Sequence, residues 1–95
     1  MLISYTPRFK KDIESFKSAK GCLPGKVWQL IFDIEKNPTA IAGLGNPELL
    51  RHNLKGHFSR RITREHRLVY AFDGKSETLR IISAGSHYRD LEDLI

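Results

Sequence analysis

Three kinds of side chain in this sequence suit chemistry at a phosphodiester: a loop carboxylate, several arginines and a histidine–tyrosine pair. They are Glu48, Arg51, Arg61, Arg67, His87 and Tyr88. A carboxylate can take the proton of a ribose 2′-hydroxyl, and an imidazole or a phenol can protonate the departing 5′-oxygen. Guanidinium groups stabilise the extra charge on phosphorus, since their planar donors meet two oxygens at once. This combination predicts transfer without a metal ion or cofactor.

Each of these residues also has a simpler interpretation. Glu48, which follows a proline, fits a solvated loop acid, and His87-Tyr88 fits a surface turn. The arginines suit plain phosphate binding equally well. No spacing of cysteine and histidine is typical of zinc, and residues 43–45 (GLG) lack the lysine of a phosphate-binding loop.

Positive charge gathers in the segment that holds the arginines. Residues 51–67 read RHNLKGHFSRRITREHR, with six arginines and lysines against the single acid Glu65. This net charge of +5 equals that of the whole chain, so the remainder is neutral. Clustered charge attracts polyanions, and we expect Lys55 and Arg60, with Arg51, to bind substrate. We expect the histidines of this segment, at positions 52, 57 and 66, to be structural or peripheral.

The 95 residues, 40% hydrophobic and 28% charged, are typical of one globular domain spanning 1–95. Cys22 is the single cysteine, so an internal disulfide is excluded and a reducing compartment is favoured. Charge appears too early for a signal peptide, and no apolar run approaches the ~20 residues of a membrane span. We expect a cytoplasmic protein.

The amino-terminal half predicts a strand followed by two amphipathic helices. The strand is Leu2–Tyr5, the first helix begins at Thr6-Pro7 and ends at Gly21, and the second runs from Pro24 to Asn37-Pro38. Their apolar stripes are Phe9, Ile13 and Phe16, then Val27, Leu30, Ile31 and Ile34. Trp28 and Phe32 widen the second stripe, which fits either a helix wedged into the core or a partner-binding face.

The second half predicts an irregular segment, Thr39–Asn53, and then three strands. The strands are His57–Thr63, Arg67–Asp73 and Thr78–Ala84. The order β-α-α-β-β-β indicates an α+β fold, a two-helix hairpin packed on one face of a small, mostly antiparallel sheet. The opposite face should be free to display the basic segment.

The register of the first strand pair decides whether Arg61 and Arg67 work together. A three-residue loop would place Arg61 opposite Val69, and Arg61 and Arg67 would then share a face. A two-residue loop would place them on opposite faces. Both alternatives are open at this point.

Residues 45–72, GNPELLRHNLKGHFSRRITREHRLVYAF, resemble the YoeB-type mRNA interferase toxins of the RelE/ParE superfamily. The shared pattern includes Pro47-Glu48, Ser59-Arg60-Arg61-Ile62 and His66-Arg67-Leu68-Val69-Tyr70, and His87-Tyr88 matches the family's terminal pair. The amino-terminal half fits the family only in its strand-helix-helix layout.

The resemblance implies a RelE-like fold and a ribosome-dependent endoribonuclease that cuts mRNA in the decoding site, leaving a 2′,3′-cyclic phosphate. Glu48 would be the general base, Arg61 and Arg67 would stabilise the transition state, and His87 or Tyr88 would donate the proton. The implied register places Arg61 and Arg67 on one face. A YefM-like antitoxin and a homodimer are the expected partners, beside mRNA and the ribosome. Arg51 would help orient the phosphate or the base.

Two other functions fit the same residues. In a ParE-like gyrase inhibitor the acid, arginine, histidine and tyrosine set would be idle. A plain nucleic-acid-binding module would bind with a steep salt dependence and yield no product.

Arg89–Ile95 extends past the family's terminal pair, with three acids and three apolar residues. One hypothesis is that it folds across the basic face and restrains activity; the other is a final helical turn. If the segment covers the basic face, deleting Arg89–Ile95 should raise RNA affinity and its salt dependence in a binding titration. Unchanged binding would remove the first hypothesis.

Overall fold

The structure is a computed structural model and describes residues 1–17, 23–51 and 54–85. The elements of these ranges are β1 Leu2–Tyr5, α1 Pro7–Lys17, α2 Leu23–Lys36, β2 Glu48–Leu49, β3 Phe58–Arg61, β4 Arg67–Asp73 and β5 Thr78–Ser83. The predicted α+β fold is confirmed. The difference lies in β2, a short strand inside the segment expected to be irregular. No helix in these ranges is long and apolar enough to cross a membrane.

Helix α1 begins where the sequence predicts, because Thr6 caps it. The Thr6 hydroxyl accepts the Phe9 N–H at 3.1 Å, and the Thr6 carbonyl accepts the Lys10 N–H at 3.1 Å. Pro7 follows at the first helical position, where a missing N–H costs nothing. The predicted end of this helix at Gly21 lies outside the described residues.

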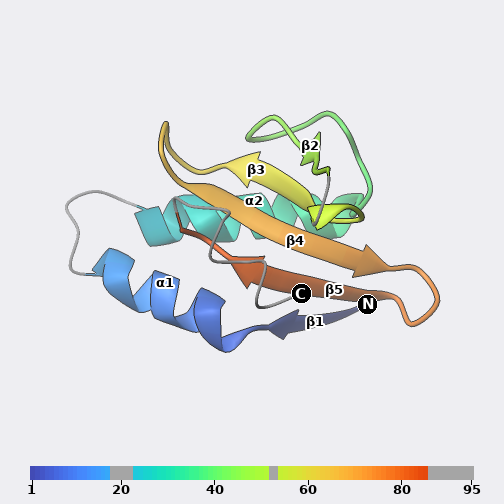
Figure 1. The fold of residues 1–95 in the computed structure, drawn as a ribbon, viewed down its shortest axis with the longest axis horizontal. Helices are drawn as coiled ribbons and strands as arrows, with labels where there is room; N and C mark the ends of the chain where they lie inside the picture. Colours follow the sequence, from blue (N-terminus) through green and yellow to red (C-terminus); the bar gives the residue numbers. More distant parts are fainter. Residues whose placement is uncertain (18–22, 52–53, 86–95) are drawn as a thin grey trace.

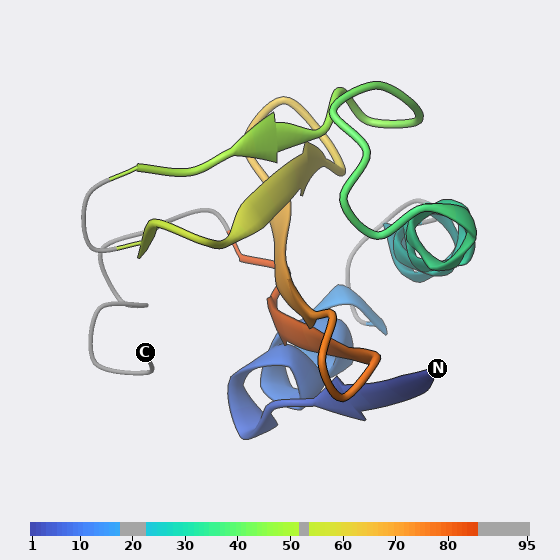
Figure 2. The ribbon, with the colours of Figure 1, turned by 90° about the vertical axis from the view of Figure 1, so that its right-hand side faces the viewer.

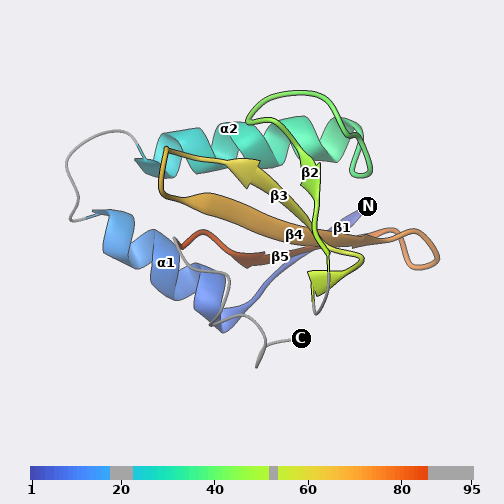
Figure 3. The same ribbon diagram turned by 45° about the horizontal axis from the view of Figure 1, so that its top comes forward.

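The five strands form one sheet in the order β1-β5-β4-β3-β2 (Figure 1). β1 pairs with β5 in parallel, and the other neighbours are antiparallel. Figure 3 shows β4 lying between β3 and β5 for most of its length. The outer strand β2 is added by the chain that arches from the end of α2 across to β3 (Figure 2).

Both helices pack on the same face of the sheet, since their apolar stripes join a single core. Its buried residues are Phe9, Ile13, Phe16, Val27, Leu30, Ile31, Ile34, Ile62, Leu68, Tyr70, Leu79, Ile81 and Ala84. Leu68 and Tyr70 in β4 and Leu79 and Ile81 in β5 alternate with residues that face the other way. The predicted stripes are therefore the ones that the fold buries.

The opposite face of the sheet is partly covered, which corrects the expectation that it is free. Leu50, Leu54, Val69 and Ile82 make a second, smaller buried cluster there. The ladder continues past β2, because the Leu50 N–H donates to the His57 carbonyl at 2.9 Å. The chain after β2 thus shields part of this face with apolar side chains.

Trp28 and Phe32 are 45% and 66% exposed, so the core interpretation applies to them only in part. The Trp28 ring meets Tyr5 and Phe9 edge-on, with centroids 6.0 Å apart in both pairs. The Lys36 ammonium lies 5.2 Å from the centre of the Phe32 ring. Phe32 therefore belongs to the outer surface of α2.

Replacing Thr6 tests how α1 is fastened to the sheet. Thr6→Ala removes the cap and also a hydroxyl that donates to the Ile82 carbonyl of β5. We expect the free energy of unfolding to fall by about 1–2 kcal/mol, measured by urea denaturation. Thr6→Ser keeps the hydroxyl and should lose much less; equal losses in the two variants would contradict this role.

Candidate active site

The register of β2, β3 and β4 places an acid and two arginines on one face of the sheet. Glu48 lies opposite Ser59 in the β2–β3 pair. Ser59 lies opposite Val69, and Arg61 lies directly opposite Arg67, in the β3–β4 pair. Paired residues of antiparallel strands share a face, and so do residues two apart on one strand. The shared face is the one away from the helices.

Their spacing suits a single phosphodiester. The α-carbons of directly opposed residues such as Arg61 and Arg67 lie roughly 5 Å apart, and diagonal neighbours such as Glu48 and Arg61 about 7–8 Å apart. Glu48 and Arg61 are exposed, and Arg67 is half-buried. Like charges directly opposite one another destabilise a sheet, so the arginine pair favours an anion between its members.

The connection between Arg61 and Arg67 differs from both alternatives considered for the sequence. Five residues, 62–66, link the two strands, and the Ile62 N–H donates to the His66 carbonyl at 3.0 Å. Arg61 therefore pairs with Arg67 itself instead of Val69. The arginines share a face, as the family resemblance implied.

The guanidinium of Arg67 is held by the loop that precedes it. Its Nη1 donates to the carbonyls of Thr63, Arg64 and His66 at 2.8, 3.1 and 3.0 Å. The Thr63 hydroxyl in turn accepts the Glu65 and His66 N–H groups at 3.2 and 3.0 Å. These bonds limit the rotamers of Arg67, so less side-chain entropy is lost when it binds an anion.

Gly45 brings the chain close enough to β3 for Glu48 to enter the sheet. The Gly45 carbonyl accepts the Arg61 N–H at 2.6 Å. Its φ of +75° is strained for other residues, and an added Cβ would lie 2.8 Å from both the Arg61 carbonyl oxygen and Leu30 Cδ2. Pro47, which is buried, then leads into β2.

Arg60 lies inside the molecule, which corrects its assignment to substrate binding. It is 1% exposed. Its Nη1 donates to the Asp33 carboxylate and, at 3.1 Å, to the Leu44 carbonyl, while its Nε donates to the Tyr70 hydroxyl at 3.0 Å. Strand alternation is the signal that predicts this, since Arg60 and its neighbour Arg61 must face opposite sides.

The other predicted site residues lie after β2 or outside the described part of the chain. Arg51 and Lys55 are exposed on the segment after β2, beside Leu54. His87 and Tyr88, the predicted proton donors, lie outside the described residues. Of the histidines thought structural, His66 meets the Phe16 ring edge-on at 5.2 Å, with its Nδ1 2.9 Å from the Thr63 hydroxyl.

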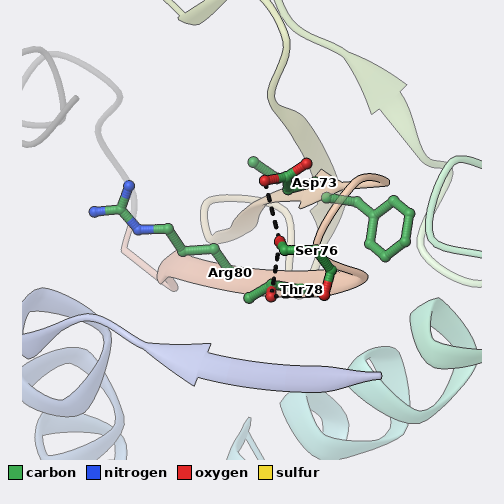
Figure 4. A pocket seen from close by; sticks show the side chains of 6 residues that line it. Asp73, Ser76, Thr78 and Arg80 are labelled. Carbon is green, nitrogen blue, oxygen red and sulfur yellow. Dashed lines mark hydrogen bonds between the residues drawn. The ribbon is translucent and has the colours of Figure 1, made fainter.

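A pocket of about 340 Å³ lies elsewhere, at the β4–β5 hairpin (Figure 4). It is lined by Ala71, Phe72, Asp73, Ser76, Thr78 and Arg80. The Asp73 carboxylate accepts the Lys75 N–H at 2.9 Å and the Ser76 hydroxyl at 3.0 Å, and these bonds lower the pKa of Asp73. Asp73 therefore stabilises the hairpin turn, and this pocket is not the candidate active site.

Comparison with known proteins extends the resemblance to most of the chain. Residues 5–88 match the family model of the YoeB-like toxin of bacterial type II toxin-antitoxin systems. Toxin YoeB of Escherichia coli (strain K12) is 48% identical over 63 residues, which cover 66% of this chain and 70% of that protein. The solved YoeB/ParE toxin from Agrobacterium tumefaciens has a TM-score of 0.83 at 35% identity, covering 93% and 100% of the two chains.

A further solved structure is the heterotetrameric YoeB-YefM toxin-antitoxin complex from Staphylococcus aureus. It has a TM-score of 0.77 at 37% identity and covers 93% of this chain and 99% of that one. Fold and comparisons together define a small α+β toxin of the RelE-like class. The chain belongs to the YoeB family, the toxins of bacterial type II toxin–antitoxin systems, which confirms the predicted resemblance.

The Asp33–Arg60 pair predicts a pH-dependent stability. The hydrogen bond from Arg60 lowers the pKa of Asp33 below its usual 3.8. A lowered pKa in the folded state means that the stabilisation is complete above the unfolded value and is lost as the pH falls through the folded value. Asp33→Asn should therefore be less stable than the natural protein at pH 7, and the difference should shrink below about pH 4.

Urea denaturation at a series of pH values measures this difference. Glu35→Gln, at an exposed acid two residues further along α2, is the matched control and should change stability little. A gap between Asp33→Asn and the natural protein that stays constant down to pH 3 would contradict the assigned pKa shift.

Proposed function

We propose that this toxin is a ribosome-dependent endoribonuclease that cleaves mRNA in the decoding site and so inhibits translation. The observation that carries the proposal is the register, which sets Arg61 directly opposite Arg67 and places Glu48 diagonal to Arg61 on the same face. Two arginines directly opposite one another repel, so an anion between them is favoured, and the nearby carboxylate can serve as the general base for its ribose. Membership of the YoeB family supports the same function.

In the proposed reaction the Glu48 carboxylate accepts the proton of the ribose 2′-hydroxyl. The 2′-oxygen then forms a bond to phosphorus, and the bond from phosphorus to the 5′-oxygen breaks. His87 or Tyr88 donates the proton that the 5′-oxygen needs, and the products are a 2′,3′-cyclic phosphate and a free 5′-hydroxyl. Each proton released is matched by one supplied, as acid–base catalysis requires.

Arg61 and Arg67 stabilise the charge that builds on the non-bridging oxygens of the pentacoordinate phosphorus. Arg67 suits this role because its rotamer is already fixed by three loop carbonyls. The fixed positive charge replaces a metal ion in this mechanism. Arg51 and Lys55, both exposed after β2, bind and orient the flanking RNA.

The partners follow from the family and from charge. Structures of related toxins include the S. aureus heterotetramer with YefM and a YoeB dimer from the same organism. We infer that this toxin binds a YefM-like antitoxin, which restrains it in the cytoplasm, and that it forms a homodimer. Its net charge of +5 favours mRNA and ribosomal RNA as the other partners.

Mapping mRNA on translating ribosomes by primer extension tests the reaction. The natural protein should cut within the decoding-site codon, and Glu48→Gln and Arg67→Ala should each lower the cleavage rate by about 10²-fold or more. Lys10→Ala is the matched control, since Lys10 is an exposed cation on α1, in the helical layer on the other side of the sheet. It should cut like the natural protein.

Replacing the ribose at the cleaved position by 2′-deoxyribose should abolish cutting, because the nucleophile is removed. Equal cleavage by Glu48→Gln and the natural protein would refute the assignment of the base. Intact mRNA together with inhibited gyrase would instead support the ParE-like alternative. Tight, salt-dependent binding without any product would support a plain nucleic-acid-binding module.

A further inference from the structure

Helix α1 is fastened to the carboxyl-terminal end of β5 at two places. Near its start, the Thr6 N–H donates to the Ile81 carbonyl at 3.1 Å, and the Thr6 hydroxyl donates to the Ile82 carbonyl. One and a half turns further on, Asp12 accepts the Ala84 N–H on its Oδ2 at 2.9 Å. The helix thus holds the chain both in the last residues of the strand and just beyond them.

Asp12 is unusual for an acid on a helix because its side chain is only 14% exposed. Its second oxygen, Oδ1, accepts the Nε–H of Arg8 at 3.3 Å. Gly85 packs beside this pair, since a Cβ placed on it would lie 3.6 Å from Arg8 Nη2 and 3.6 Å from Asp12 Oδ2. Both carboxylate oxygens therefore have hydrogen-bond partners, and one of them is a backbone group from another element.

The next peptide connects Asp12 to the proposed active site. The Gly85 carbonyl accepts the backbone N–H of Arg67 at 3.1 Å. Arg67 directly follows the loop 62–66 and is the first residue of β4. A path of two hydrogen bonds thus runs from the Asp12 carboxylate to the Ala84 N–H and from the Gly85 carbonyl to the Arg67 N–H.

We propose that Asp12 is a positioning residue for the RNA-cleaving site, acting through Ala84 and Gly85 on the backbone of Arg67. The inference rests on the proposed function for its catalytic consequence, although the hydrogen-bond path stands without it. By accepting the Ala84 N–H, the Asp12 carboxylate fixes the position of the next peptide, and so of the Gly85 carbonyl. That carbonyl accepts the Arg67 N–H and thereby sets the backbone position of Arg67 at the start of β4. A carboxylate on the helical layer in this way controls an arginine whose side chain works on the opposite face of the sheet.

Removing the carboxylate should misplace Arg67 without unfolding the protein. Asp12→Ala frees the Ala84 N–H and lets the Gly85 peptide shift, and a displacement of about 1 Å in a catalytic group can cost ~10²-fold in rate. We expect kcat for cleavage of ribosome-bound mRNA to fall about 10- to 100-fold, with KM little changed. Asp12→Asn keeps an oxygen that can accept the Ala84 N–H, and its kcat should stay near that of the natural protein.

Amide hydrogen exchange gives a second measurement that does not need activity. In Asp12→Ala the amides of Ala84 and Arg67 should exchange about tenfold faster or more, whereas those of Tyr70 and Leu79 in the sheet interior should not change. Glu35→Gln, which also removes one acid from a helix, is the control and should alter neither kcat nor exchange. Rates are compared at a temperature where circular dichroism shows every variant folded.

The outcomes separate this inference from the proposed function. A folded Asp12→Ala with the kcat and Arg67 exchange of the natural protein would overturn it, as would an activity loss that merely follows the unfolded fraction. Equal effects of Asp12→Ala and Asp12→Asn would overturn the role of the Ala84 hydrogen bond. If the natural protein leaves mRNA intact, the proposed function fails, and the exchange of the Arg67 amide still decides whether Asp12 positions it.

Discussion

The buried guanidinium of Arg60 connects three parts of the molecule, and the geometry of the candidate site depends on these connections. It donates to Asp33 of α2, to the Leu44 carbonyl in the segment leading to β2, and to the Tyr70 hydroxyl of β4. A charge with these partners is stable inside, whereas the same charge without them would be costly. The register of β3 is therefore locked, because a slip by one residue would exchange Arg60 for Arg61 on the inner face.

With Arg60 inside, Arg61 has to face outward, opposite Arg67. The same network holds Leu44, whose N–H also donates to Asp33 at 3.3 Å, and Gly45 then brings the chain to β3 so that Glu48 pairs with Ser59. The positions of the acid and the arginines thus follow from one partly buried ion pair and one glycine. The helical layer contributes from the other side, where Thr6 and Asp12 hold the end of β5.

Much of this fold could be predicted from local signals. The Thr6-Pro7 cap, the apolar stripe containing Val27 and Leu30, and the alternation in β4 each depend on residues close in sequence, and the structure confirms them. The family resemblance predicted that Arg61 and Arg67 share a face, and the register confirms it.

Other features depend on contacts between distant residues and were beyond local patterns. The five-residue loop 62–66 closes around the Thr63 hydroxyl and the Arg67 guanidinium, a geometry that loop length alone does not specify. The covering of the second face by Leu50 and Leu54 has no periodicity to reveal it. The burial of Arg60 needs Asp33, 27 residues earlier in the chain, as a partner.

The most direct test of the locked register is an NMR spectrum of the arginine Nε–H groups, recorded with and without an RNA oligonucleotide that carries 2′-deoxyribose at the cleaved position. The account predicts that the Arg60 signal exchanges slowly with water and does not respond to the oligonucleotide, while the Arg61 and Arg67 signals shift together with one affinity. A shift of Arg60 on binding, or separate affinities at Arg61 and Arg67, would contradict it.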